Sequence, residues 1–191
     1  MGWWKDAMGP GPRRGALVIP VVVVVVAAAV TFRLVAAAAG TEAVRSAGMS
    51  GVLVDVLNVG VLWLVVPSVG AYLCARRAPL AAVLGAALAW LMTGVYYGTA
   101  VPDAPHEVVW MLGGAVVAAG YSSLLAATRM APWMVAAPFV LELPAVTALA
   151  AARGHAPGGT VVVVGLVEAA LGLLLMVALT VRRRDRATRR D

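Results

Sequence analysis

The chain has 191 residues, of which 62% are hydrophobic and 13% charged, and its mean hydropathy is +0.93. This composition excludes an ordinary water-soluble protein, and apolar stretches follow one another so closely that no room remains for a soluble catalytic domain. The formal net charge is +6, and the single cysteine, Cys74, excludes both an intramolecular disulfide and a cysteine-based metal cluster.

In chain order, six apolar segments are each long enough to cross a bilayer as a helix, which needs roughly 20 residues. Pro and Gly punctuate the gaps between them. We therefore predict an all-α integral membrane protein, a six-helix transmembrane bundle with short loops that forms one transmembrane domain over 1–191. The predicted helices cover 15–38, 51–75, 79–101, 107–128, 131–152 and 159–181, between an N-terminal segment 1–14 and a basic tail 182–191.

The orientation follows from the basic residues, because Lys and Arg next to a span are retained on the cytoplasmic side. On one set of helix ends only Arg45 and Arg153 are basic. The other set carries Lys5, Arg13, Arg14, Arg76, Arg77, Arg129, Arg182, Arg183, Arg184, Arg186, Arg189 and Arg190. The sequence thus predicts a multi-pass protein of the cell membrane with both termini in the cytoplasm, its tail contacting anionic lipid headgroups rather than nucleic acid.

A competing interpretation makes the N-terminus a signal peptide, since a basic stretch precedes an apolar run that ends in the small residues 36–39. The run is longer than a typical signal core, and Arg33 interrupts its distal part. Cleavage would leave five spans with the C-terminus still inside, so charge counting does not separate the two interpretations.

Four ionisable residues fall inside the predicted spans, and each costs about 2.5 to 3.5 kcal/mol near the bilayer centre. Glu142 and Glu168 are predicted at mid-bilayer on adjacent helices, with no basic residue at their depth. We expect at least one of them to keep its proton and to serve as a proton donor, the alternative being neutral acids that hydrogen bond to helix backbones. Pro138 and Pro144 lie on either side of Glu142 and weaken the backbone hydrogen bonding of its helix. Gly165 and Gly172 lie on either side of Glu168, where the lack of side chains lets a neighbouring helix approach closely.

The other two, Arg33 and Asp55, match in depth near the external end. They predict an ion pair between the first two helices, with Asn58 on the same face as Asp55, and the alternative is a contact with substrate. Aromatic residues gather in the same half: Trp63, Tyr96, Tyr97 and Trp110. They are interpreted either as an interfacial belt or as the lining of a cavity that stabilises a positive charge. No cofactor motif is present, so we expect no cofactor and no metal.

Several segments resemble small six-pass membrane proteins of high-GC bacteria, over roughly 79–185. They are 84–88 leading to Tyr96 and Tyr97, the pair Gly113 and Gly114, 139–144 and 167–172. The chain is also similar to the small membrane-bound terpene cyclases of bacterial secondary metabolism, which use intramembrane acids to protonate an alkene or epoxide. This resemblance implies that Glu142, Glu168 and Asp55 are the catalytic acids.

Three hypotheses follow. The first is a membrane-embedded cyclase, with Tyr96, Tyr97, Trp110, Trp63, Asn58 and Arg33 contacting a lipophilic, prenylated substrate. The second is a proton-coupled transporter or efflux component, expected to be a homodimer because six spans are few for one carrier. The third is a non-catalytic membrane subunit.

Overall fold

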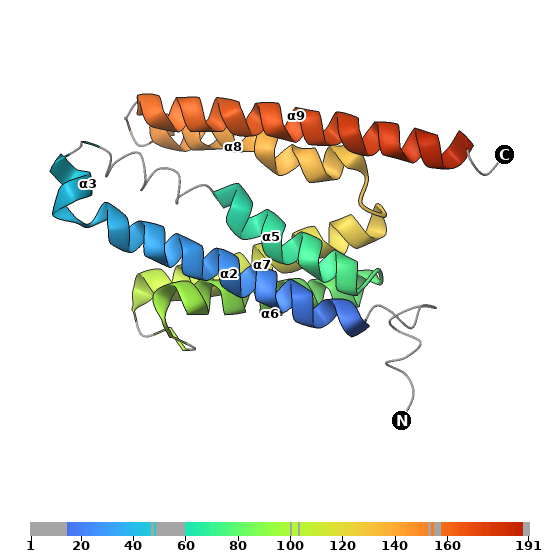
Figure 1. Ribbon diagram of the computed structural model, residues 1–191, viewed down its shortest axis with the longest axis horizontal. Coiled ribbons are helices and arrows are strands. Elements are labelled where there is room, and N and C mark those ends of the chain that lie inside the picture. Colours follow the sequence, from blue (N-terminus) through green and yellow to red (C-terminus); the bar gives the residue numbers. More distant parts are fainter. Residues whose placement is uncertain are drawn as a thin grey trace. The chain divides into compact units, whose positions relative to one another are not determined.

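The computed structural model describes residues 15–46, 48, 60–99, 101–102, 104–152, 154 and 158–188. Every regular element among them is an α-helix, as the composition predicts (Figure 1). The elements are α2 (Gly15–Ala39), α3 (Glu42–Ser46), α5 (Gly60–Cys74), α6 (Ala78–Tyr97), α7 (Pro105–Ala127), α8 (Pro132–Ala152) and α9 (Gly159–Thr188).

Five of the described helices are long and apolar enough to cross a membrane: α2, α6, α7, α8 and α9. The described part of the segment predicted at 51–75 is the shorter apolar helix Val61–Cys74. Large apolar side chains remain exposed on the outer faces, Ile19 at 72%, Val116 at 71% and Leu174 at 66% among them. Such surfaces are stable next to lipid tails rather than water, so the chain is a membrane protein.

Proline marks the start of three helices, since Pro79, Pro105 and Pro132 each stand in a first turn, where the missing N–H is no loss. The third helix ends four residues before the predicted end at 101. Helix α6 ends at Tyr97 because Gly98 adopts a left-handed conformation, with φ at 77°, and donates its N–H to the Gly94 carbonyl. In contrast, α9 continues past the predicted end at 181 into the basic tail, as far as Thr188.

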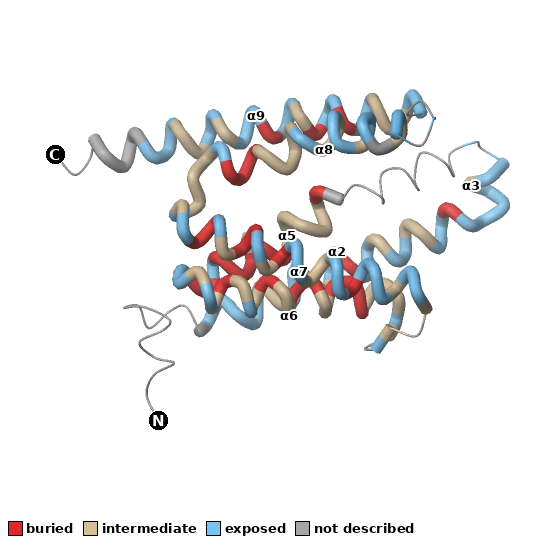
Figure 2. The backbone as a smooth tube through the Cα atoms, turned by 180° about the vertical axis from the view of Figure 1, so that it is seen from behind, coloured by how far each residue is buried: buried red, intermediate tan, exposed pale blue. Residues whose placement is uncertain are grey.

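The contacts divide the chain into two compact units, Met1–Met130 and Ala131–Asp191, and each is described by itself. In the first unit, α6 packs on α7, and both contact α5, while α2 lies against α6 and α5. Buried positions gather where α5, α6 and α7 face one another (Figure 2). One cluster of the core contains Val25, Ala29, Ala71, Leu88 and Met92, from α2, α5 and α6.

The tightest helix contact of the first unit is centred on Gly85. A Cβ atom at this position would overlap the Ser122 hydroxyl and lie 2.8 Å from the Ala118 carbonyl oxygen. Ser122 and Ser68, both fully buried, donate hydrogen bonds to that same carbonyl at 2.6 and 3.4 Å. The lack of a side chain at Gly85 therefore lets α6 approach α7 closely, as expected for small residues in membrane helices.

In the second unit, α8 and α9 pack side by side (Figure 1). Two glycines of α9 make this contact close. A Cβ at Gly165 would lie 2.8 Å from the Cβ of Leu143, and one at Gly172 would lie 2.6 Å from the Cβ of Phe139. The prediction that Gly165 and Gly172 allow a neighbouring helix to approach next to Glu168 is therefore confirmed, and that helix is α8.

Candidate functional site

The two mid-span acids meet. The carboxyl groups of Glu142 in α8 and Glu168 in α9 are joined by a side-chain hydrogen bond. Glu168 is only 8% exposed, and Glu142 is half-buried. An ionised carboxylate only accepts hydrogen bonds, so this contact is favourable when one of the two carboxyls holds a proton.

The described basic side chains of the second unit lie far along α9 from the pair. In the described part of Ala131–Asp191, the basic side chains begin at Arg182, which follows Glu168 by fourteen positions, or about 21 Å of helix. A second proton loss would leave two adjacent negative charges in a low-dielectric environment, which is strongly unfavourable. The pair is therefore suited to hold one proton and to give it to a strong enough acceptor.

Helix α8 is continuous but contains a proline on each side of Glu142. Pro144 has no N–H to donate to the Val140 carbonyl, and Pro138 has none for the Met134 carbonyl. Both prolines lie within the helix, one turn before and two residues after the acid. Local weakening of the helix next to an ionisable group is typical of functional positions in membrane proteins.

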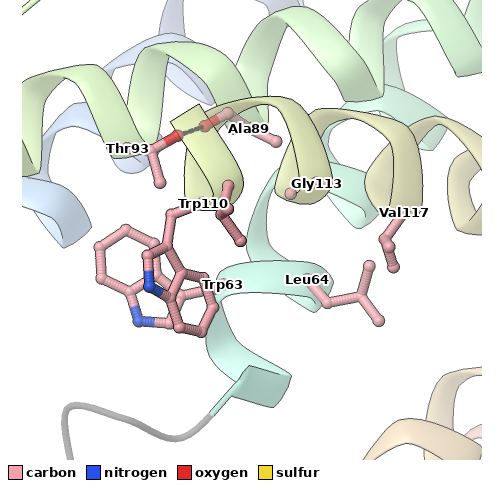
Figure 3. Close-up of a pocket in the computed structure, with 9 residues that line it drawn as sticks. Trp63, Leu64, Ala89, Thr93, Trp110, Gly113 and Val117 are labelled. Atoms are coloured by element: carbon pink, nitrogen blue, oxygen red, sulfur yellow. Dashed lines mark hydrogen bonds between the residues drawn. The ribbon is translucent and has the colours of Figure 1, made fainter. Parts of the chain in front are cut away.

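A cavity of about 350 Å³ lies in the first unit, between α5, α6 and α7. Its lining consists of Trp63, Leu64, Ala89, Thr93, Val109, Trp110, Gly113, Gly114 and Val117. Figure 3 shows Trp63 and Trp110 at one end and Leu64 and Val117 at the other. The Thr93 hydroxyl donates to the Ala89 carbonyl of its own helix, so the lining is apolar apart from the indole N–H groups.

Glycine forms one wall of this cavity. A Cβ at Gly113 or Gly114 would meet nothing within 4 Å, in contrast to Gly85. These two glycines therefore leave open space, although small residues in membrane helices commonly serve close packing. The sequence feature that could have indicated that Gly113 and Gly114 form a cavity wall is their position one helical turn after Trp110 in α7.

Aromatic rings form a continuous series beside the cavity. Phe32 of α2 lies 5.0 Å from Trp63 of α5, measured between ring centroids, and Trp63 lies 5.1 Å from Tyr96 of α6. Tyr96 is 5.1 Å from Tyr97, which is 5.8 Å from His106 in the first turn of α7. Tilted and edge-to-face geometries of this kind are the favoured ones. The predicted gathering of Trp63, Tyr96 and Tyr97 is thus present, and Trp110 joins Trp63 at the cavity.

Arg33 is exposed on α2, and its guanidinium donates a hydrogen bond of 3.3 Å to the Val95 carbonyl of α6. Asp55 and Asn58 lie outside the described residues, so the predicted ion pair with Asp55 and the polar cluster around it remain predictions. Sequence reasoning did not identify Thr93, Leu64, Val109 and Val117 as cavity residues, because their role depends on the rotation of each helix about its axis.

Comparisons with protein-family models, with curated proteins and with solved structures gave no match to this chain.

Proposed function

We propose that this protein is a membrane-embedded enzyme that cyclises a lipophilic, isoprenoid substrate, with the Glu142 and Glu168 pair as the proton donor. The observation that carries the proposal is the hydrogen bond between the two carboxyls, one of which is almost fully buried. A neutral carboxylic acid in an apolar environment meets an alkene without competition from water, which is the requirement for general acid catalysis in a bilayer.

The proposed reaction is an isomerisation. The protonated carboxyl donates its proton to one carbon of an alkene, or to an epoxide oxygen, and leaves a cation on the substrate and a carboxylate on the protein. A second alkene of the same chain attacks the cation and closes a ring. Loss of a proton from a neighbouring carbon back to the carboxylate gives the product and restores the acid, so no cofactor is consumed.

The first unit, taken by itself, also contains a cavity that suits a lipophilic ligand. Its volume of about 350 Å³ is at the lower end of the range typical of ligand pockets, and its lining offers carbon surfaces and two indole rings. Aromatic faces stabilise cations at distances up to about 6 Å from the ring centre. A prenyl chain matches both properties, since it is apolar and carries the positive charge during cyclisation.

The decisive experiment uses membranes that contain the full chain, a prenylated aromatic substrate and buffer in D₂O. We expect a cyclised isomer that has gained one deuterium from the enzyme acid, and we expect Glu142→Gln and Glu168→Gln to abolish it. Glu42→Gln is the matched control, because Glu42 is an exposed acid of α3 that pairs with Arg45 at 3.8 Å. Unchanged turnover of a substrate without an epoxide in both pair variants, or a cyclised product of that substrate without carbon-bound deuterium, would refute the proposal.

A second candidate is a proton-coupled carrier, favoured by the prolines within α8 on both sides of Glu142, which remove backbone hydrogen bonds next to the acid. Helices with weakened backbone hydrogen bonding beside an acid at mid-membrane are characteristic of such carriers. Substrate accumulation that collapses when the proton gradient is dissipated would favour this function. An enzyme is expected to work in detergent, where no gradient exists.

For the orientation, we infer that both termini lie in the cytoplasm and that the protein resides in the plasma membrane. The inference is supported by the distribution of basic residues between the two sets of helix ends. In this orientation, the arginines at the end of α9 stand at the cytoplasmic surface, where each contributes about 1 kcal/mol to contact with anionic headgroups.

A further inference from the structure

Arg33 is the one charged residue of α2, which is otherwise apolar from Gly15 to Ala39 apart from Thr31. It precedes the end of α2 by six residues, or about 9 Å along the axis. Its guanidinium lies at the level where α6 ends, because it contacts the Val95 carbonyl and the turn at Gly98. The end of a spanning helix marks the boundary between hydrocarbon and headgroups, and the neighbouring Trp90, Tyr96 and Tyr97 are residue types enriched at this boundary.

The guanidinium is held in place by a specific feature of α6. A Cβ atom at Gly98 would lie 2.6 Å from one terminal nitrogen of Arg33 and 3.0 Å from the other. Gly98 therefore serves twice, since it adopts the left-handed conformation that ends the helix and leaves space for the guanidinium. Among the described residues, the contacts that fix the position of this cation are with the backbone of α6 and the turn after it.

The described residues satisfy only a small part of the hydrogen-bonding capacity of Arg33. A guanidinium has five N–H donors. Among the described residues, Arg33 makes one hydrogen bond, to Val95, and no ion pair, whereas Arg45 pairs with Glu42. A cation that lies among apolar residues and keeps free donors is complementary to an anion that accepts two parallel bonds.

A second cavity, of about 430 Å³, opens beside the guanidinium. It is lined by Arg33, Trp90 and Leu91, together with Gly94, Gly98 and Thr99. Apart from Arg33 and Thr99, these residues offer apolar surface. The Thr99 hydroxyl already bonds to the Val101 carbonyl. The cavity thus combines one charged group at the membrane boundary with an apolar wall.

We propose that this cavity between α2 and α6 binds an anionic phospholipid, with the phosphate on Arg33 and the first part of an acyl chain along Trp90 and Leu91. The proposal is independent of the function of Glu142 and Glu168. It explains why an arginine is retained in an apolar helix, because the phosphate offsets the cost of placing the cation at the edge of the hydrocarbon.

The first test is performed on the full chain in nanodiscs of neutral lipid with or without phosphatidylglycerol. Photoactivatable phosphatidylglycerol is expected to label residues of the cavity, Trp90 or Leu91 above all, in the unmodified protein. Arg33→Gln is expected to lower this labelling about fivefold, which corresponds to about 1 kcal/mol for one basic residue near the surface. Arg45→Gln is the matched control and is expected to leave it unchanged.

A second measurement separates lipid binding from a structural role of Arg33 at the end of α6. The melting temperature of the unmodified protein is expected to rise when phosphatidylglycerol is added, and Arg33→Gln is expected to lose most of this rise. The proposal would be overturned if Arg33→Gln lowered the melting temperature equally in neutral and anionic nanodiscs and still showed the full rise when phosphatidylglycerol is added. Labelling confined to the arginines at the end of α9, or labelling at Trp90 that inorganic phosphate abolishes, would also overturn it.

Discussion

At the scale of single residues, glycines divide into those that bring helices together and those that leave space. Gly85, Gly165 and Gly172 belong to the first group, since a Cβ at each would collide with the facing helix. Gly113 belongs to the second, since a Cβ there would meet nothing within 4 Å. The same residue type thus serves packing in one helix and a cavity in another.

This division predicts opposite effects for two alanine substitutions. Gly85→Ala is expected to force α6 away from Ser122 and to disturb the buried hydrogen bonds on the Ala118 carbonyl, which lowers the stability by about 1 to 3 kcal/mol. Gly120→Ala in α7 is the control, because a Cβ there meets nothing within 4 Å, and a gain of up to about 1 kcal/mol is expected. Melting curves in detergent measure the stability of both variants. Equal changes in stability for Gly85→Ala and Gly120→Ala would contradict the close packing at Gly85.

At the scale of helices, the α8 and α9 pair positions the acids. The contacts of Gly165 with Leu143 and of Gly172 with Phe139 lie on either side of Glu168. Both contacts bring the axis of α9 close to α8, so that two short carboxyl side chains reach each other. The geometry of the candidate donor therefore depends on residues that carry no chemistry themselves.

We predict that Gly172→Ala alters the carboxyl pair without removing either acid. The added methyl group would lie 2.6 Å from Phe139 Cβ and 3.2 Å from the Ala136 carbonyl oxygen, so the helices must separate near Glu168. The infrared band of the protonated carboxyl, identified by its loss in Glu168→Gln, is expected to shift as the hydrogen bond weakens. Leu173→Ala, an exposed neighbour at 49%, is the control. An identical band in Gly172→Ala would disprove the coupling.

Much of this arrangement was predictable at the level of helices. The apolar lengths, with Pro and Gly in the gaps, predicted the starts of α2, α6, α7, α8 and α9 to within two residues. The matching depth of Glu142 and Glu168 on adjacent helices made a contact between the two acids possible. The end of α6 at Tyr97 was not predicted, because the left-handed turn at Gly98 depends on backbone hydrogen bonds to Gly94. The cavity was predicted only through Trp63 and Trp110, since periodicity does not determine how a helix that is apolar all round is rotated.

At the scale of the whole molecule, the segment predicted at 51–75 determines whether the number of spans is even. Its described part is shorter than the five long apolar helices. An even number of spans places both termini on one side, and an odd number places them on opposite sides. The inferred orientation therefore depends on this one segment together with the basic residues.

Labelling of single cysteines tests the orientation. In a Cys74→Ser background, Gly154→Cys stands before α9 and Arg183→Cys stands near its far end. A membrane-impermeant thiol reagent applied to intact cells is expected to modify the cysteine at 154 and to reach the one at 183 only after lysis. Reversed labelling would show that both termini lie outside. It would not affect the turnover test of the Glu142 and Glu168 variants or the infrared test of the carboxyl pair.

The hydrogen bond between Glu142 and Glu168 also has a consequence for biosynthesis. Each acid alone would make its helix an unfavourable segment to release from the translocon into lipid. The hydrogen bond between the two carboxyls lowers the cost of placing them in lipid, and a short connection joins their helices. We therefore expect α8 and α9 to leave the translocon together, as a hairpin, once α9 has been synthesised.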